Sequence, residues 1–207
     1  MQDKRDKIEG PTLVLASGSP RRRTLLKREG IAFSVVESRI HERRRREEDA
    51  EAFSLRMAAE KALAVSYRIA EPIVLGADTV VDCGGEILGK PKDAADARRM
   101  LRMLSGRSHT VTTAYAIARA GALIETRAVR SGVTFRRLAE EEIDAYIASG
   151  DPFDKAGSYG IQDGGATFIA AVDGSRDNVM GLPVEDVLEA LARCGIVPEK
   201  RPGGRDG

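Results

Sequence analysis

Short apolar runs alternate with helical patterns along the first third of the chain. The run at 12–16 is typical of a buried strand. It is followed by a helix start, with Ser19 as the N-cap and Pro20 in the first turn. Gly30 ends this helix, and residues 32–36 predict a second strand. The order strand, helix, strand is typical of α/β proteins.

The later pattern changes to hairpins before it returns to helices. We expect helices over 50–69, from Asp93 to Gly106, over 140–148 and over 183–194. We expect strands over 73–75 and 167–172, a hairpin over 80–88, and two long antiparallel strands, 109–119 and 124–135. The sequence therefore predicts an α/β fold with a mixed sheet, formed as two lobes around a cleft.

Composition bounds the size and the class of the protein. The chain has 207 residues, enough for one large domain, which we place at 11–195 between flexible polar tails at 1–10 and 196–207. It has 33 basic and 32 acidic residues, a net charge of +1, which excludes a globally basic nucleic-acid binder. Aromatic residues make up 4% and Trp is absent, which argues against base-stacking platforms. We expect no stable nucleic-acid binding.

The few cysteines and histidines and the lack of long apolar runs argue against a disulfide-rich, zinc-binding or membrane-spanning protein. Cys83 and Cys194 lie far apart and predict no disulfide framework. His41 and His109 are the only histidines, too few for a three-histidine zinc site. The sequence has no run of 18 apolar residues, so no membrane span is predicted. The polar start of the chain does not look like a signal peptide. We therefore expect a cytoplasmic protein.

The segment SGSPRR, residues 17–22, is the first candidate binding site. Unpaired backbone N–H groups and the positive end of the helix dipole favour an anion such as phosphate at a helix start. Arg21, Arg22 and Arg23 lie in the same first turn, where positive charge opposes the dipole unless an anion is bound. The alternative is an ordinary capped helix with solvated arginines.

Two further segments offer charged side chains. Asp78, in VLGADT, follows an apolar run and is expected at the carboxyl edge of the sheet, where it can bind a cation or act as a base. The alternative is an aspartate that closes a turn. Lys90, in GKPKD, can reach a phosphate, although a solvated surface lysine is the simpler interpretation.

A glycine-rich stretch, 154–165, is the last candidate. Its four glycines allow close approach of the backbone to a ligand. Gln162 offers a donor and an acceptor to a nucleobase edge, and Tyr159 offers a flat amphipathic surface. A mobile surface loop is the alternative. We expect a tight loop with a structural role at 177–183. We expect a solvated loop for Arg43–Arg46, whose charge is neutralised by the acidic residues that follow.

Together these segments resemble the Maf family of nucleotide pyrophosphatases over about residues 12–193. The resemblance rests on motifs in the same order: LASGSPRRRTLLKREGI, EKA, VLGADTVV, GEILGKPKD, MLRMLSGRSHTVTTA, DPFDKAGSYGIQ and NVMGLP. It implies a mixed twisted sheet with helices on its faces and a deep cleft, as in the inosine triphosphate pyrophosphatases. It also implies cleavage of a nucleoside triphosphate to monophosphate and pyrophosphate with a divalent cation, Mg²⁺ or Mn²⁺.

The same resemblance implies residue roles. Asp78 matches the proton acceptor, and it also matches a metal position together with Glu42. The chain reads His41-Glu42-Arg43 where the family often has further acidic residues. The positions that handle phosphate match Ser17, Arg22, Lys61 and Lys90.

The resemblance also favours one branch of the family. Arg21, Thr79 and Gln162 match the specificity positions of the dTTP and UTP branch, whereas the 7-methyl-GTP branch resembles SPWRR, SDQ and Glu at these places. A homodimer is implied as well. Two alternative functions stay open: a nucleotide-binding regulator of septum formation, and a purine-directed housekeeping pyrophosphatase.

Overall fold

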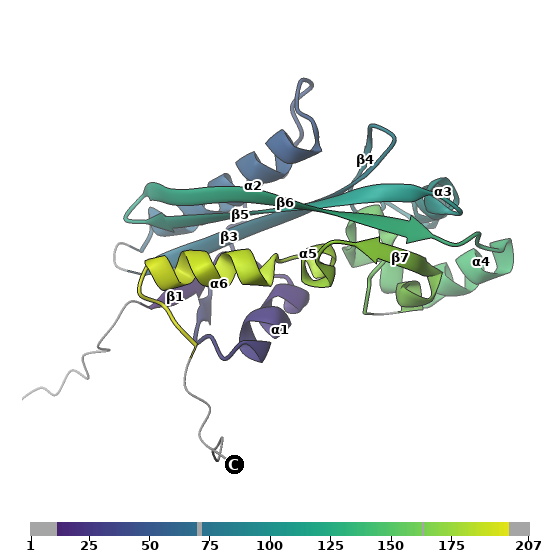
Figure 1. Cartoon of the computed structure of the whole chain (residues 1–207). Coiled ribbons are helices and arrows are strands. Elements are labelled where there is room, and N and C mark those ends of the chain that lie inside the picture. The colour runs from purple at the N-terminus through teal and green to yellow at the C-terminus, as the bar shows by residue number, and fades with distance from the viewer. Residues whose placement is uncertain (1–11, 70–71, 163, 199–207) are drawn as a thin grey trace, which may run out of the picture.

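One mixed seven-stranded sheet organises the computed structural model, which describes residues 12–69, 72–162 and 164–198 (Figure 1). The strands are β1 (Leu13–Leu15), β2 (Ser34–Val35), β3 (Ile73–Cys83), β4 (Glu86–Leu88), β5 (Ser108–Arg119), β6 (Ala122–Phe135) and β7 (Ile169–Asp173). Their order is β2-β1-β3-β5-β6-β7, with β4 paired to β3. β1 runs parallel to β2 and β3, and the other pairs are antiparallel. The mixed sheet predicted from the sequence is thus confirmed.

Helices lie on both faces of this sheet. They are α1 (Pro20–Arg28), α2 (Ala50–Ser66), α3 (Ala94–Leu104), α4 (Glu140–Ala148), α5 (Arg176–Met180) and α6 (Val184–Arg193). Three short 3₁₀ turns are η1 (Asp151–Asp154), η2 (Ala156–Ser158) and η3 (Gly164–Phe168). In Figure 1, α2 lies on one face and α1 and α6 lie on the other. Across the described ranges, no helix is long and apolar enough to cross a membrane.

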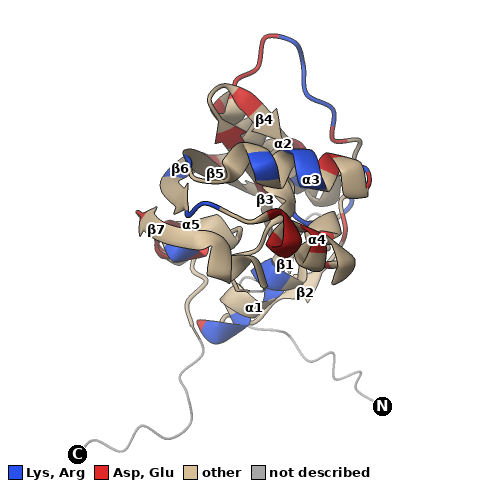
Figure 2. Ribbon diagram, turned by 90° about the vertical axis from the view of Figure 1, so that its right-hand side faces the viewer, with Lys and Arg blue, Asp and Glu red and all other residues tan. Residues whose placement is uncertain are grey.

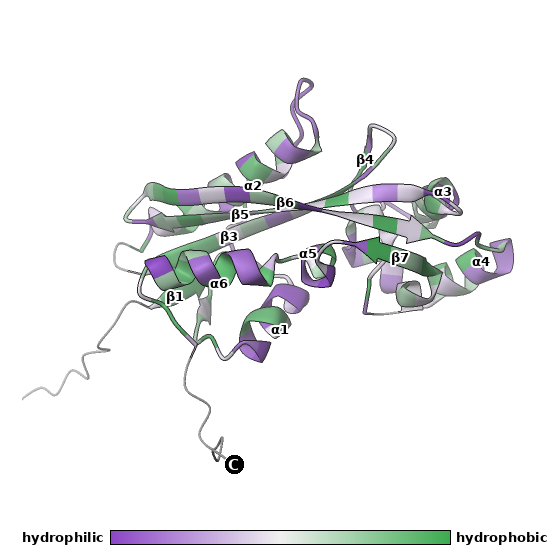
Figure 3. Cartoon of the chain, in the orientation of Figure 1, coloured by the Kyte–Doolittle hydropathy of each residue, from purple (hydrophilic) through white to green (hydrophobic). Residues whose placement is uncertain are grey.

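The first lobe surrounds the parallel strands. On one face, small side chains of α2, Ala58 and Ala62 among them, pack against alanines of β5 and bring the helix close to the sheet. On the other face, Leu25 and Leu26 of α1 share a core with Val187 and Leu191 of α6. The spacing of the apolar positions in α6 gives one apolar stripe that faces the sheet, and its polar residues face outward (Figure 3).

The second lobe forms around Phe135, which is fully buried near the end of β6. Its ring makes edge-to-face contacts with Tyr159, Phe168 and His109, an arrangement that aromatic rings favour. Apolar residues of α3 and α4 complete this core. Because β3 and β5 contribute side chains to both lobes, a single sheet joins them and fixes their spacing.

Most predicted elements are confirmed, but two are corrected. The strand predicted at 73–75 does not end there: β3 continues to Cys83, because β5 pairs with it from Val74 to Asp82. The short helix α5 replaces the plain loop expected within 177–183. The tail predicted at 1–10 and residues 199–207 of the other tail lie outside the described residues.

The basic run Arg43–Arg46 is exposed in the loop that precedes α2, as expected. Basic and acidic residues follow one another in this loop (Figure 2). Glu48, which closes the run, contacts Arg56 of α2 and accepts from the backbone N–H of Arg45. The side chains of the run are therefore solvated, and the Glu48 carboxylate that follows them is held by Arg56 and by the backbone of the loop.

Candidate active site

A cavity of about 650 Å³ lies between the two lobes. It opens where the edge of β3 changes partners: β1 pairs with residues 73–75 of β3, and β4 pairs only with 81–83. The intervening residues, including Asp78 and Thr79, line the cavity. Asp78 therefore lies inside a strand and not after one, which corrects the sequence interpretation. It still lies just beyond the carboxyl end of β1, where α/β proteins place ligands.

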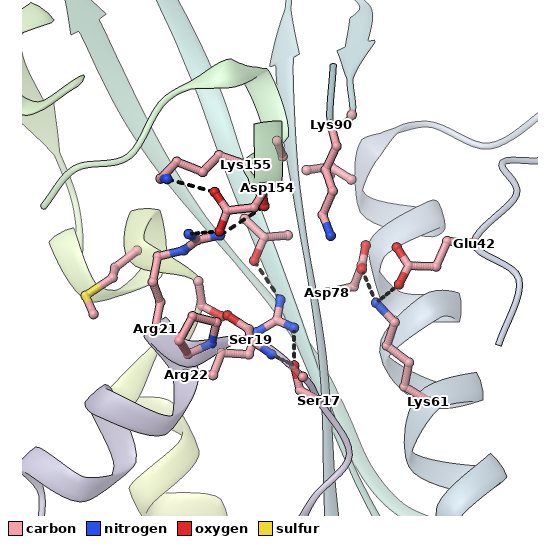
Figure 4. Close-up of a pocket in the computed structure, with 18 of the residues that line it drawn as sticks. Ser17, Ser19, Arg21, Arg22, Glu42, Lys61, Asp78, Lys90, Asp154 and Lys155 are labelled. Carbon is pink, nitrogen blue, oxygen red and sulfur yellow. Dashed lines mark hydrogen bonds and ion pairs between the residues drawn. The ribbon is translucent and has the colours of Figure 1, made fainter. Parts of the chain in front are cut away.

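Asp78 is a buried carboxylate paired with a buried ammonium. It is 5% exposed, and its Oδ1 lies 2.7 Å from Nζ of Lys61 on α2. The same Nζ lies 2.7 Å from Oε1 of Glu42, whose side chain is half-exposed at the cavity wall. Two carboxylates thus converge on one ammonium (Figure 4).

Gly76 explains how α2 comes close enough for this contact. A Cβ at Gly76 would lie 2.3 Å from the carbonyl oxygen of Ala58 and 2.7 Å from the backbone nitrogen of Ala62. Only a residue without a side chain lets the helix backbone approach the strand this closely. Lys61, which immediately precedes Ala62, then reaches Asp78 two residues along β3.

The pKa values of Asp78 and Glu42 are shifted in opposite directions. Burial raises the pKa of Asp78 above its ordinary value, although the charge and hydrogen bond of Lys61 and the charge of Arg22 oppose this. Burial also raises the pKa of Glu42, but there Lys61, Lys90 and Arg22 outweigh it and the net pKa is lowered. Asp78 therefore holds a proton more readily than an ordinary aspartate does, and Glu42 less readily than an ordinary glutamate.

Arg22 of α1 is buried and held by three acceptors. Nε donates to the Gly181 carbonyl at 2.8 Å, one terminal nitrogen to Ser17 Oγ at 3.0 Å and the other to Thr79 Oγ1 at 3.1 Å. The backbone N–H of Ser19 also donates to Ser17 Oγ, at 3.3 Å. Because both bonds use the Ser17 oxygen as an acceptor, its own O–H is left to donate to an anion.

A chain of hydroxyls fixes the direction of the bond to Thr79. Thr113 Oγ1 donates to the carbonyl oxygen of Asn178 at 2.8 Å, so its single hydrogen is used. Thr79 Oγ1, 3.0 Å away, must then donate to Thr113 and accept from Arg22. Thr79, predicted as a specificity residue, here holds Arg22 in place.

Arg21 reaches across the cavity to the second lobe. Its terminal nitrogens donate to Oδ2 and to the carbonyl oxygen of Asp154, at 2.9 and 3.3 Å. Oδ1 of Asp154 accepts from Lys155 Nζ at 2.7 Å, and Lys155 is 6% exposed. Burial raises the pKa of Asp154, but the hydrogen bonds and charges of Lys155 and Arg21 outweigh it, so the net pKa is lowered.

Lys90 enters from the loop between β4 and α3. It lines the cavity, and Figure 4 shows its amine directed toward Asp78. The Gly89 carbonyl accepts from the backbone N–H of Gly157 at 3.0 Å, which ties this loop to the segment that carries Asp154. Lys90 thus lines the cavity, where the family resemblance implies a residue that handles phosphate.

The cavity includes every predicted site residue except Gln162. Gln162 is exposed and lines a smaller adjoining hollow of about 260 Å³, together with Arg28 and Arg176. Tyr159 is buried, and its hydroxyl lies 2.7 Å from His109 Nε2. The expectation that Tyr159 offers an open flat surface is wrong, because its ring is packed in the core of the second lobe.

The carboxylates of Asp78 and Glu42 fit a hard cation whose remaining ligands come from a substrate and from water. Within the described ranges, no group of three histidine, cysteine or acidic residues could hold a metal by itself. Mg²⁺ is commonly held by one or two carboxylates, with phosphate oxygens and water completing the shell. The Lys61 ammonium marks the point where these two carboxylates already converge on positive charge.

Four contributors to the site were missed by the sequence analysis. Asp154 and Lys155 lie in the glycine-rich stretch, and their charge within it is the feature that could have drawn attention to them. Thr113 lies in an alternating strand, where its hydroxyl looks like any other polar strand residue. Gly181 acts through its backbone carbonyl, which no sequence pattern reveals.

Known proteins resemble this chain in sequence. The dTTP/UTP pyrophosphatase of Salmonella typhimurium strain LT2 is 46% identical over 191 residues, covering 92% of this chain and 96% of that protein. Proteins of the same name from Escherichia coli O157:H7 and Shigella dysenteriae are 45% identical with the same coverage. A Ham1 protein structure from Coxiella burnetii is 14% identical with a TM-score of 0.48, covering 88% of this chain and 99% of that one. The family model described as Maf-like protein matches residues 12–194, and the chain belongs to this family.

Proposed function

We propose that this protein hydrolyses dTTP and UTP to the nucleoside monophosphate and pyrophosphate. The observation that carries the proposal is Asp78, a buried carboxylate in a cavity that also brings together the cationic side chains of Arg22, Lys61 and Lys90. The name shared by relatives of 45–46% identity supports the choice of nucleotides.

Positive charge in the cavity suits a triphosphate, which carries about four negative charges at neutral pH. Arg22 of α1, Lys61 of α2 and Lys90 of the loop before α3 line the cavity, so they can contact several phosphates at once. Ser17 offers a hydroxyl donor beside the start of α1, whose dipole adds further positive potential. These groups stabilise the charge that develops on the departing pyrophosphate.

Asp78 is the group in the cavity suited to accept a proton from the attacking water. Burial raises its pKa, which makes it a stronger base than an ordinary aspartate. A bound phosphate competes with Asp78 and Glu42 for the Lys61 ammonium, and this frees the Asp78 carboxylate to take the proton. Asp78 and Glu42 would hold Mg²⁺ or Mn²⁺, which when bound supplies charge that polarises phosphate oxygens.

The preference for a pyrimidine base is assigned to Arg21, Thr79 and Gln162. Arg21 and Thr79 line the cavity, and Thr79 also holds Arg22. Gln162 lines the adjoining hollow, but Ile161 and Met180 line both spaces, so a base that extends past them reaches the Gln162 amide. An amide can donate and accept, as the edge of uracil or thymine requires.

The test is release of pyrophosphate from a panel of dTTP, UTP, dCTP, GTP and ATP in Mg²⁺ and in Mn²⁺. We expect dTTP and UTP to be cleaved fastest and the products to be monophosphate and pyrophosphate. A preference for GTP or ATP would favour a purine-directed enzyme. Tight nucleotide binding without turnover would favour a regulator, and release of orthophosphate would overturn the reaction itself.

Two further expectations accompany this function. A homodimer is expected, and sedimentation equilibrium of the whole chain measures it. A folded unit over 11–195 is expected, and limited proteolysis with mass analysis of the protected fragment tests its boundaries.

A further inference from the structure

Asp154 is an acidic side chain in a cavity that we assign to a triphosphate. A carboxylate there repels phosphate, so a purely passive Asp154 would weaken binding. Its two oxygens, however, contact two different cations, Arg21 and Lys155. The carboxylate is therefore compensated on both sides, and its position is defined by both contacts.

The pair of Arg21 and Asp154 joins the two lobes. Arg21 lies in the first turn of α1, which packs in the first lobe, and Asp154 ends η1 in the second. Two acceptors of Asp154, the carboxylate and the backbone carbonyl, bind two nitrogens of one planar guanidinium. A two-point contact of this kind fixes the plane of the guanidinium as well as its position.

The neighbouring Arg22 side chain points in a different direction from the Arg21 side chain. Arg22 turns inward to Ser17, Thr79 and Gly181, whereas Arg21 turns across the cavity. Lys155 Nζ donates to Oδ1 of Asp154, the carboxylate oxygen that Arg21 does not contact, and it also donates to the Asp151 carbonyl at 2.6 Å. Asp154 thus sits between a buried lysine and the arginine that it orients.

We propose that Asp154 is a positioning residue: it fixes the Arg21 guanidinium across the cavity mouth, and through Arg21 it sets the preference for a one-ring over a two-ring base. This rests on the proposed function, which assigns base preference to Arg21. Asp154 itself contacts no reacting atom in this role. It acts by keeping the Arg21 side chain in the orientation in which it lines the cavity between the lobes.

The test is a double-mutant cycle with Asp154→Ala and Arg21→Ala. We expect Asp154→Ala to lower kcat/KM for dTTP about tenfold and to lower the dTTP-to-GTP ratio by a similar factor. In the Arg21→Ala background, the same change should have less than about a twofold effect, because the group that it positions is gone. Asp154→Asn, which keeps an acceptor but loses the charge, should fall between wild type and Asp154→Ala.

The matched control is Glu140→Ala, which removes an exposed carboxylate that contacts Arg102 with both oxygens, between α3 and α4. It should leave the nucleotide ratio unchanged. If Asp154→Ala raised kcat/KM for every triphosphate, Asp154 would act only by repelling phosphate and the proposal would be wrong. Equal effects of Asp154→Ala in both backgrounds would also overturn it.

The same cycle is measured on binding of the non-hydrolysable analogue α,β-imido-dUTP by calorimetry. This separates the two proposals, because wild-type protein that binds the analogue but cleaves no triphosphate would contradict the function alone. Loss of affinity in Asp154→Ala that disappears in the Arg21→Ala background supports the positioning role. Unchanged affinity in Asp154→Ala contradicts it.

Discussion

The Lys61 ammonium lies 2.7 Å from Oδ1 of Asp78, and both side chains are 8% exposed. Such a buried pair is held together by mutual attraction and by the cost of leaving either charge unpaired. Glu42 shares the same ammonium from the solvent side, so Lys61 can exchange partners without leaving the cavity. The charge of the Asp78 carboxylate is thus neutralised by the Lys61 ammonium in this structure.

Replacing Asp78 with asparagine should nearly abolish turnover while nucleotide binding stays measurable. The amide keeps the size of the side chain but cannot accept the proton, and loss of a general base costs on the order of 10²–10⁴ in rate. Pyrophosphate release measures turnover, and calorimetry with α,β-imido-dUTP measures binding. A variant that kept more than about a tenth of the wild-type rate would show that Asp78 is not the base.

Gly76→Ala should destabilise the fold, because the new Cβ would meet the α2 backbone at 2.3 Å from the Ala58 oxygen. Overpacking of this kind costs about 1–3 kcal/mol or more. Gly89→Ala is the matched control, since a Cβ there meets nothing within 4 Å. Urea unfolding of both variants gives the comparison, and equal stabilities would mean that α2 can move away from β3 freely.

Thr79→Val should lower stability by about 1–3 kcal/mol, because it removes the acceptor of a buried Arg22 nitrogen. Thr79→Ser keeps the hydroxyl and should retain most of the stability. Denaturant unfolding measures the difference. If the valine variant changed only the choice of nucleotide and unfolded like wild type, the hydrogen bonds from Arg22 through Thr79 to Thr113 would not contribute to the free energy of unfolding.

Stability should fall in acid because of His109. Burial lowers its pKa from 6.5 to about 4, so between these values the unfolded chain binds the proton that the folded chain excludes. This contribution is fully present above pH 6.5, and about 3 kcal/mol of it is lost by pH 4. His109→Gln, which does not titrate, should flatten the curve of unfolding free energy against pH over that range. Parallel curves for both proteins would contradict the assignment.

Gln162→Glu should lower kcat/KM on dTTP and UTP by about tenfold, the effect of one hydrogen bond of roughly 1.4 kcal/mol. A carboxylate accepts but cannot donate, so one edge group of the pyrimidine is left unpaired. The relative rates on dTTP, UTP and GTP provide the measurement. Unchanged relative rates would remove Gln162 from base recognition and leave the role of Asp78 intact.

The local patterns of the sequence determined most elements, because they depend on neighbours in the chain. The start of α1 at Pro20, its end before Gly30 and the cap of α3 at Asp93 all follow from backbone geometry and capping chemistry. Alternating apolar residues likewise predicted the long strands β5 and β6. The order of motifs predicted the family, which the comparisons confirm.

Only the tertiary structure decided how these elements meet. That β3 runs on through Asp78 depends on pairing with β5, which lies far along the chain. The contact between Lys61 and Asp78 depends on the approach of α2 over Gly76, and the one between Arg21 and Asp154 joins residues 133 positions apart. Such contacts depend on packing between distant segments, and local propensity carries no information about them. The sequence therefore predicted Arg21, Lys61 and Asp78 as site residues but not the residues that they contact.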